Sequence, residues 1–281
     1  MRLGVFGINA GSTYGREETL RLVRLAEDLG LDSVWAGEHV VVPSPRVPPS
    51  PMEPTDPILD PLVHLAFVAA ATQRVLLATG IVILPQRNPL VLAKQAAALD
   101  VLSGGRLLLG IGAGYLEPEM TAVGVPFADR GARTDDHIAA MRALWARPGP
   151  VEHDGPFVSF SGVDAHPRPL QPGGPRIVVG GHTGPAFRRA IAHGHGWYGF
   201  ALTPETAAQC LDALRRAASE VERPPELGEL EISVTPRRRL DAESVAGFAA
   251  AGVHRVVTNV IGAKTPADVE ARLRAAAELV S

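Results

Sequence analysis

The chain has 281 residues, 46% of them hydrophobic, which is enough to bury the core of one large domain. Its formal net charge is −3, with 27 basic and 30 acidic residues spread without long runs, which argues against nucleic acid or an anionic membrane surface as its main partner. The single cysteine, Cys210, excludes a disulfide framework and a thiolate metal site, and we interpret it as a buried structural thiol.

The beginning of the sequence carries no signal-peptide pattern ahead of Arg2. No apolar run approaches the roughly 18–20 residues that a membrane-spanning helix needs. We therefore expect a soluble, cytoplasmic protein that acts on a small molecule.

The first elements alternate between strand and helix. Residues 2–8 predict a strand, 17–29 a helix, and 33–36 a second strand that ends in Gly37, Glu38 and His39. Residues 43–61 contain eight prolines, so they cannot form a helix and predict a long loop. A loop of this length is typical of a pocket wall. A helix over 60–72 follows it.

The stretch 74–117 organises the rest of the chain. The continuous apolar run 75–84 predicts a strand covered on both faces. Asn88 and Pro89 mark the start of a helix that ends at the glycines 104–105, and 107–111 predicts a second buried strand. Two buried strands joined by a crossover helix form a parallel unit, so both end on the same face. We expect the chemistry on that face.

The remaining chain continues the alternation after one interruption. A helix over 130–145 is followed by a predicted hairpin of 151–153 and 157–160, within an insertion of about 147–175. Further strands are predicted at 176–180, 197–200, 230–234 and 255–258, and further helices at 185–193, 203–221, 242–251 and 266–280. Eight strands alternating with eight or more helices predict a closed (β/α)8 TIM barrel that forms a single domain over 1–281. An open doubly wound sheet is the alternative.

The glycine-rich segment 110–114 fails as a dinucleotide fingerprint, because Tyr115 occupies the sixth position and no first-strand context precedes it. Gly112, Ala113 and Gly114 would let a flat ligand approach the backbone, or they form a tight turn. Gly80 interrupts an apolar strand, which indicates a bulge.

Two further segments contain groups suited to chemistry. Glu38 and His39 place a carboxylate beside an imidazole at a strand end, where the pair could position a proton donor, although such pairs are also common on surfaces. The segment from Gly180 to Thr183 precedes a helix, so its amides, a Thr hydroxyl and His182, if it is charged, could bind an anion. Thr183 could equally be an ordinary N-cap.

His193 and His195 could suggest a metal pair, but they lie between a helix and a strand start, on the face opposite the predicted pocket. The first strand lacks His-x-His, and no G-x-S-x-G nucleophile motif occurs. We therefore expect no metal.

Four blocks of the sequence resemble the bacterial-luciferase-like flavin oxidoreductases, particularly their branch that depends on the deazaflavin coenzyme F420. They are MRLGVFG (1–7), LGLDSVWAGEHVV (29–41), TGIVILPQRNPLVLAKQAAALDVLSGGRLLLGIGAGY (79–115) and PRIVVGGHTGPAFRRAIAHGHGW (175–197). The blocks occur in family order and at family spacing. The resemblance fades after Trp197.

The resemblance implies a cofactor lying across the carboxyl ends of the strands. Its ring would back onto a bulge in the third strand with a non-proline cis peptide at Gly80–Ile81, or within one residue of it. Its phosphate would lie before the helix that follows residue 180. The implied cofactor-binding residues are Glu38, His39, Thr79, Gly80, Ile81, Val82, Gly112, Ala113, Gly114, Gly180, Gly181, His182 and Thr183.

The resemblance further implies a coenzyme F420-dependent oxidoreductase, in which a hydride passes between the deazaflavin and a small organic substrate. His39 would pass the proton, with Glu38 as the second catalytic residue. Arg87, Tyr115 and Trp197 would bind a planar or carbonyl-bearing substrate. Tyr115 stands where sugar-phosphate dehydrogenases of this family carry an acidic residue, which weakens the case for sugar oxidation.

Two other functions remain open for such a chain. One is an FMN-dependent monooxygenase, and the other is a non-catalytic member that binds cofactor. The sequence leaves a homodimer open, and it identifies neither the substrate nor the direction of hydride transfer.

Overall fold

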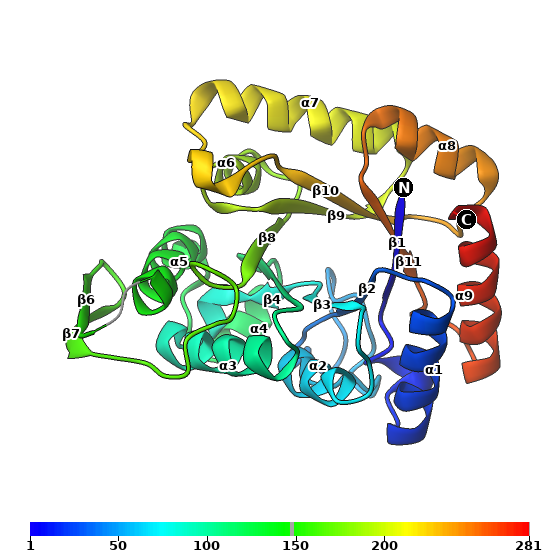
Figure 1. Ribbon diagram of the computed structural model, residues 1–281, viewed down its shortest axis with the longest axis horizontal. Coiled ribbons are helices and arrows are strands. Elements are labelled where there is room, and N and C mark those ends of the chain that lie inside the picture. The colour runs from blue at the N-terminus through cyan, green and yellow to red at the C-terminus, as the bar shows by residue number, and fades with distance from the viewer. Residues whose placement is uncertain (147–148, 281) are drawn as a thin grey trace.

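The computed structural model describes residues 1–146 and 149–280. Its main sheet is made of parallel strands surrounded by helices (Figure 1). The strands are β1 (Arg2–Phe6), β2 (Ser33–Ala36), β3 (Leu76–Thr79), β4 (Val82–Ile83), β5 (Leu107–Gly112), β8 (Arg176–Gly180), β9 (Gly196–Leu202), β10 (Glu231–Pro236) and β11 (Arg255–Asn259).

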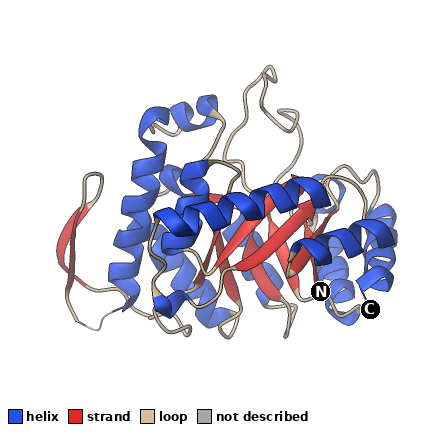
Figure 2. Ribbon diagram, turned by 90° about the horizontal axis from the view of Figure 1, so that it is seen from above, coloured by secondary structure: helices blue, strands red, loops and turns tan. Residues whose placement is uncertain are grey.

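The helices lie on the outside of the sheet, as the blue ribbons around the red strands in Figure 2 show. They are α1 (Arg16–Asp28), α2 (Pro61–Ala69), α3 (Pro89–Leu102), α4 (Glu117–Ala122), α5 (Arg130–Ala146), α6 (Gly184–His193), α7 (Pro204–Glu220), α8 (Ala242–Ala251) and α9 (Pro266–Val280). The predicted starts of α2 and α3 are confirmed, because Asp60 and Asn88 cap them with side-chain hydrogen bonds and Pro61 and Pro89 follow.

The sheet closes into a barrel. Its neighbours follow the order β3-β2-β1-β11-β10-β9-β8-β5, and β3 also pairs with β5 through Leu77 opposite Leu107. A sheet whose two ends pair with each other has no edges, so the (β/α)8 barrel is confirmed and the open doubly wound sheet is wrong.

The third strand of the barrel is divided. The predicted strand 75–84 becomes β3 and β4, which both pair with β5, and a cis peptide bond joins Gly80 and Ile81 between them. The predicted non-proline cis peptide is therefore confirmed at the expected position.

A hairpin interrupts the barrel between α5 and β8. Its strands, β6 (Val151–Asp154) and β7 (Ser159–Val163), pair antiparallel and stand apart from the barrel in both Figure 1 and Figure 2. Asp136 of α5 holds the turn, because its carboxylate accepts hydrogen bonds from the amides of Phe157 and Val158 and contacts His153. Residues 147–148, at the start of the predicted insertion, lie outside the described residues.

Two groups of buried side chains form because successive residues of a strand point to opposite faces of the sheet. The larger group fills the space between strands and helices. The smaller one fills the barrel itself and consists of Phe6, Trp35, Ala78, Leu108, Val178, Tyr198 and Val257. Cys210 is half-buried and packs against the larger group.

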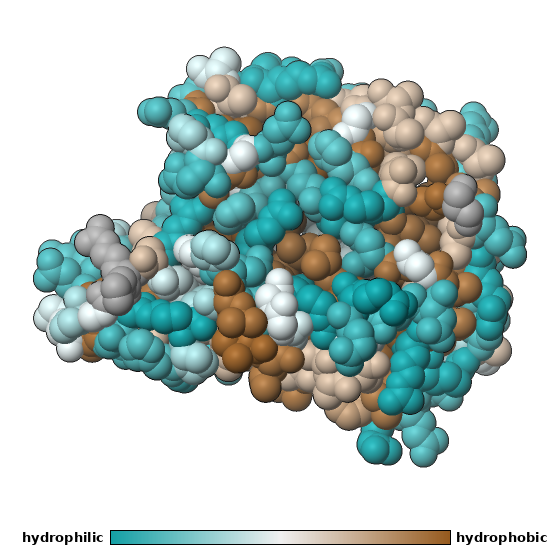
Figure 3. Space-filling view, viewed as in Figure 1, coloured by the Kyte–Doolittle hydropathy of each residue, from teal (hydrophilic) through white to brown (hydrophobic). Residues whose placement is uncertain are grey.

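Charged side chains close the end of the barrel where the strands begin. Arg255 has no exposed surface and binds Asp32 and Glu231, while Arg2 also pairs with Glu231. On the face seen in Figure 3, hydrophilic side chains cover most of the surface. Among the described residues, no helix is long and apolar enough to span a membrane.

Candidate active site

The carboxyl end of the barrel brings His39 together with a carboxylate that follows β5. The Nδ1 atom of His39 lies 2.9 Å from Oε2 of Glu119, and Oε1 of Glu119 accepts a hydrogen bond of 2.6 Å from the amide of Val40. Glu119 is buried, whereas part of the His39 ring remains accessible. A carboxylate at Nδ1 favours the proton on that nitrogen and leaves Nε2 for the reaction.

Glu119 is not among the residues predicted from the sequence, because the short helix α4 that carries it is not predicted either. The sequence does contain a helix-start signal here, because Pro118 follows the acidic residue Glu117. The apolar side chains of Leu116 and Met120 on either side are buried. Only the packing of α4 against the β2 loop shows that this carboxylate faces His39.

Tyr115 lies on the open side of His39. Its hydroxyl is 3.4 Å from Nε2 of His39, and the ring is half-exposed. Burial, together with the negative charge of Glu119, raises the pKa of Tyr115, so its phenol stays protonated at neutral pH. Its predicted contact with substrate stays a prediction, and its position beside His39 suits that role.

The predicted pairing of Glu38 with His39 is wrong. The Glu38 carboxylate points the other way, accepts a 2.6 Å hydrogen bond from the amide of Ile83, and pairs with Arg87. Burial raises the pKa of Glu38 even though Arg87 opposes this. Glu38 therefore lies in the packed layer beyond the end of β2, and its contacts do not support the predicted catalytic role beside His39.

Arg87 is held by two carboxylates. Its guanidinium binds Glu38 at 2.8 Å through Nε and binds Asp60 at 2.6 Å through Nη2, so it joins the β4 end to the start of α2. This double pairing gives Arg87 a structural role, and nothing in the contacts supports its predicted binding of substrate.

Phe6 and Ile81 form the floor of the barrel mouth. A Cβ atom at Gly37 or Gly80 would lie 2.9–3.1 Å from Phe6, and one at Gly112 or Gly180 would lie 2.5–3.0 Å from Ile81. These glycines are therefore required for packing of the floor itself. The ring of Phe200 meets Phe6 edge-on with centroids 5.2 Å apart, and Phe200 is 39% exposed.

Three of the residues predicted to contact a ligand are fully buried. Thr79, Val82 and Trp197 are each 0% exposed. The Thr79 hydroxyl donates to the carbonyl of Gly110, and Val82 packs in the outer core. The predicted cofactor contacts of Thr79 and Val82 and the predicted substrate contact of Trp197 are therefore wrong, because these side chains face the packed layers of the barrel wall.

The segment before α6 is open to solvent, as an anion site requires. Gly181, His182 and Thr183 are exposed, and Thr183 is the N-cap but its side chain makes no capping hydrogen bond. The first amides of a helix have no partner within it, so they remain available here. Trp197 supports this segment from beneath by donating 2.9 Å from Nε1 to the carbonyl of Gly181.

His182 makes a contact that positions this segment. Its Nε2 accepts a hydrogen bond of 3.1 Å from the amide of Phe200, so the ring holds the β8 end to the β9 end. Although the residue as a whole is exposed, partial desolvation of its ring lowers its pKa, which disfavours the charge that the sequence left open.

His195 is also a structural histidine. Its Nδ1 accepts a hydrogen bond from the amide of Ile177, and burial lowers its pKa to about 4. Within residues 1–146 and 149–280, no group of three or more His, Cys, Asp or Glu side chains could hold a metal.

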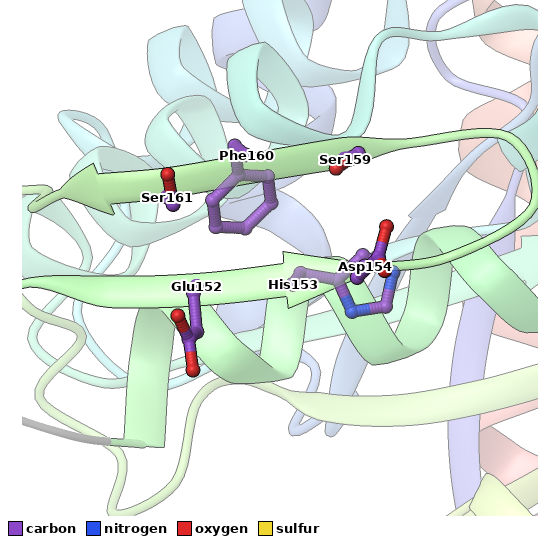
Figure 4. A pocket seen from close by; sticks show the side chains of 6 residues that line it. All are labelled: Glu152, His153, Asp154, Ser159, Phe160 and Ser161. Carbon is purple, nitrogen blue, oxygen red and sulfur yellow. The ribbon is translucent and has the colours of Figure 1, made fainter.

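A shallow depression lies on the hairpin, away from the barrel mouth. Its lining side chains, Glu152, His153, Asp154, Ser159, Phe160 and Ser161, are seen in Figure 4. It contains none of the predicted site residues, so the barrel mouth remains the candidate site.

Comparisons with known proteins agree with this architecture. Monooxygenase RslO1 from Streptomyces bottropensis superposes with a TM-score of 0.78 at 26% identity, covering 100% of this chain and 98% of that one. An F420-dependent secondary alcohol dehydrogenase superposes with a TM-score of 0.79 over 99% of this chain and 97% of its own, and its 18% identity shows the fold alone.

An uncharacterised protein of Mycobacterium tuberculosis is 35% identical over 182 residues. The match covers 62% of this chain and 64% of that protein, so the chain spans less than two thirds of this relative. The family model for luciferase-like monooxygenases matches residues 1–278. Since that match covers nearly the whole chain, the protein belongs to the luciferase-like monooxygenase family.

Proposed function

We propose that this protein is a coenzyme F420-dependent oxidoreductase that transfers a hydride between the deazaflavin and a small organic substrate. The observation that carries the proposal is the His39–Glu119 pair at the barrel mouth, with Tyr115 beside it. Hydride transfer to a carbonyl requires a proton for the oxygen, and the reverse reaction requires a base for the alcohol. A histidine oriented by a buried carboxylate performs both tasks.

The residues at the mouth suit a flat cofactor that ends in an anion. Phe6 and Ile81 offer an apolar floor beside the half-buried Gly80, and the amides before α6 offer a site for the phosphate. When bound, a deazaflavin supplies or accepts the hydride. The protein's own part is to hold the reactants in position, exclude water from the floor and move one proton at Nε2 of His39.

In this proposal Glu119 is a positioning residue. Its two oxygens are occupied by Nδ1 of His39 and by the amide of Val40, so it fixes both the ring and the backbone that carries it. Tyr115 donates from its protonated phenol either to Nε2 or to the substrate oxygen. The substrate is then a small alcohol or ketone that lies between Tyr115 and the exposed ring of Phe200.

An FMN-dependent monooxygenase is the second candidate. The similarity to monooxygenase RslO1, at 26% identity over the whole chain, favours it. The anion site before α6 does not discriminate, because FMN also ends in a phosphate. A non-catalytic cofactor-binding protein is the third candidate, and the ordered His39–Glu119 pair speaks against it.

Titration of the purified protein with each cofactor, read by fluorescence, tests the proposal. We expect micromolar or tighter binding of the deazaflavin, on the order of −8 kcal/mol, and weaker binding of FMN. Gly181→Ala should weaken both cofactors, since Gly181 has φ +124° and a Cβ there would lie 2.9 Å from that of Ala186. Tighter binding of FMN would favour the monooxygenase, and binding of neither would leave only the fold.

A further inference from the structure

Four arginines gather where β10 and β11 end, beside the barrel mouth. Arg237, Arg238 and Arg239 follow β10 directly and are all exposed. Arg272 of α9 reaches the same region, where its Nη1 lies 3.5 Å from the carbonyl oxygen of Asn259 and 3.4 Å from that of Ile261. We call these four side chains the arginine rim.

The arginine rim borders the floor of the mouth on both sides. The amide of Arg237 donates a 2.8 Å hydrogen bond to the carbonyl of Leu202, two residues beyond Phe200. On the other side, the amide of Val260 donates to the carbonyl of Phe6, just before Ile261. Phe6 and Phe200 are in ring contact, so the rim adjoins the floor on which the ligand would lie.

The positive charge of the rim is not neutralised by ion pairs. No ion pair joins any of the four arginines to a carboxylate in the part of the chain that the structure describes, whereas Arg21, Arg87, Arg189 and Arg255 all have such partners. The nearby carboxylates of Asp241 and Asp268 accept hydrogen bonds at the starts of α8 and α9, from Ser244 and Thr265. The exposed Lys264 adds a further positive charge.

Arg272 has an unsatisfied donor. Its Nε is buried without a hydrogen-bond partner within the described residues, and its Nη1 contacts are long. Burial lowers the pKa of Arg272 and the nearby charge of Arg239 acts in the same direction, while the carboxylate of Asp268 opposes both. Buried donors are normally satisfied, so an arginine with an unsatisfied donor beside other cations is suited to an anionic ligand.

We infer that the arginine rim binds the carboxylate- or phosphate-bearing extension of the ligand held in the mouth, and that this extension is the acidic tail of the deazaflavin. The inference rests on the proposed function. It adds the reason for preferring this cofactor to FMN, which ends at its phosphate and leaves the rim empty.

The test compares a rim variant with a charge-matched control. The rim variant carries Arg237→Ala, Arg238→Ala and Arg239→Ala, and the control carries Arg24→Ala, Arg215→Ala and Arg274→Ala, which are exposed arginines on α1, α7 and α9. Each set removes three positive charges and takes the net charge from −3 to −6. Circular dichroism first establishes that both variants are folded.

Dissociation constants are then measured for the deazaflavin with its acidic tail, for a form truncated at the phosphate, and for tripolyphosphate as a ring-free anion. We expect the rim variant to lose roughly tenfold in affinity for the tailed cofactor and for tripolyphosphate, but not for the truncated form. The control should match the wild type. Added salt should remove the advantage of the tailed form, because exposed charges are screened.

Each other outcome counts against the inference in a distinct way. Equal affinity of the rim variant and the wild type for tripolyphosphate would show that the rim is not an anion site. Loss of tripolyphosphate binding without any effect on the tailed cofactor would assign the anion to the substrate. Tail-independent binding of deazaflavin leaves the proposed function standing, whereas absence of all deazaflavin binding overturns both.

Discussion

At the scale of single residues, Glu38 and His39 show how adjacent side chains take opposite roles. His39 turns to the mouth and to Glu119, and Glu38 turns into the wall and to Arg87. In our proposal the same dipeptide therefore contains one residue that transfers a proton, and one residue, Glu38, that holds loops together.

Substitution by glutamine should separate the two roles. We expect His39→Gln to lower kcat by about 10²–10⁴-fold, because the proton-transfer group is lost, with little change in unfolding free energy. Glu38→Gln should cost about 3 kcal/mol of stability, because the Arg87 guanidinium loses a buried partner, and should change kcat less than tenfold. Turnover and urea denaturation of the same preparations decide this. A stable but inactive Glu38→Gln protein would contradict this assignment and would show that Glu38 takes part in the reaction.

At the scale of elements, α2 contains a histidine with an unusual environment. His64 is buried, neither of its ring nitrogens has a hydrogen-bond partner among the described residues, and burial lowers its pKa to about 4. The imidazole is therefore neutral in the folded protein at neutral pH.

This histidine should make α2 sensitive to acid. Between about pH 6.5 and pH 4 the unfolded chain binds a proton at His64 and the folded chain does not, so stability falls as the pH falls through that window. The full difference is about 3 kcal/mol. The His64→Leu variant should be at least as stable as the wild type at pH 7.5. The difference between their unfolding free energies should increase, in favour of the variant, as the pH falls towards 4. Parallel stability curves, from denaturation at each pH, would contradict this.

The pairing of β3 with β5 depends on the absence of a side chain at Gly110. A Cβ there would overlap the carbonyl oxygen of Thr79, and that oxygen belongs to the backbone and cannot move aside. We expect Gly110→Ala to cost more than about 3 kcal/mol or to prevent folding. Gly15→Ala is the control, since nothing lies within 4 Å of a Cβ at that helix start. Thermal melts that match for both variants would show that the strands can separate without cost.

At the scale of the whole molecule, the barrel is closed by apolar packing in the middle and by charge at the end where its strands begin. Arg255 binds Asp32, Glu231 and Ser233 there, and Glu231 also meets Arg2. Burial alone would raise the pKa of Glu231, but the arginines around it lower that pKa overall.

Removal of Arg255 should weaken the entire barrel. Arg255→Met leaves Asp32 and Glu231 without their shared cation, which should cost about 3–5 kcal/mol. The exposed pair of Arg274 with Glu270 provides the control, and Arg274→Met should change stability by about 0.5 kcal/mol or less.

The contribution of Glu231 should also depend on pH. Because the pKa of Glu231 is lowered in the folded protein, its contribution to stability is present above about pH 4.5 and is lost in more acidic solution. Denaturation at pH 7 and pH 4 checks both points, and equal losses in the two variants would contradict the assigned role.

Local patterns were sufficient to determine the barrel and most of its elements. Solid apolar runs, proline after a capping residue and glycine at helix ends act over a few residues, so β2, β8, α8 and α9 have the predicted bounds. The segment around Gly80 likewise contained the signal for the cis peptide, although the resemblance to a family was needed to interpret it.

Only the tertiary structure decided which side chains meet at the mouth. Glu119 lies 80 residues beyond His39, and a carboxylate on a short helix has no local pattern that names its partner. In the same way, the rotation of each strand placed Thr79, Val82 and Trp197 in the wall. The direction of a side chain depends on how a strand twists and on what packs against it, and both are properties of the assembled barrel and not of the segment.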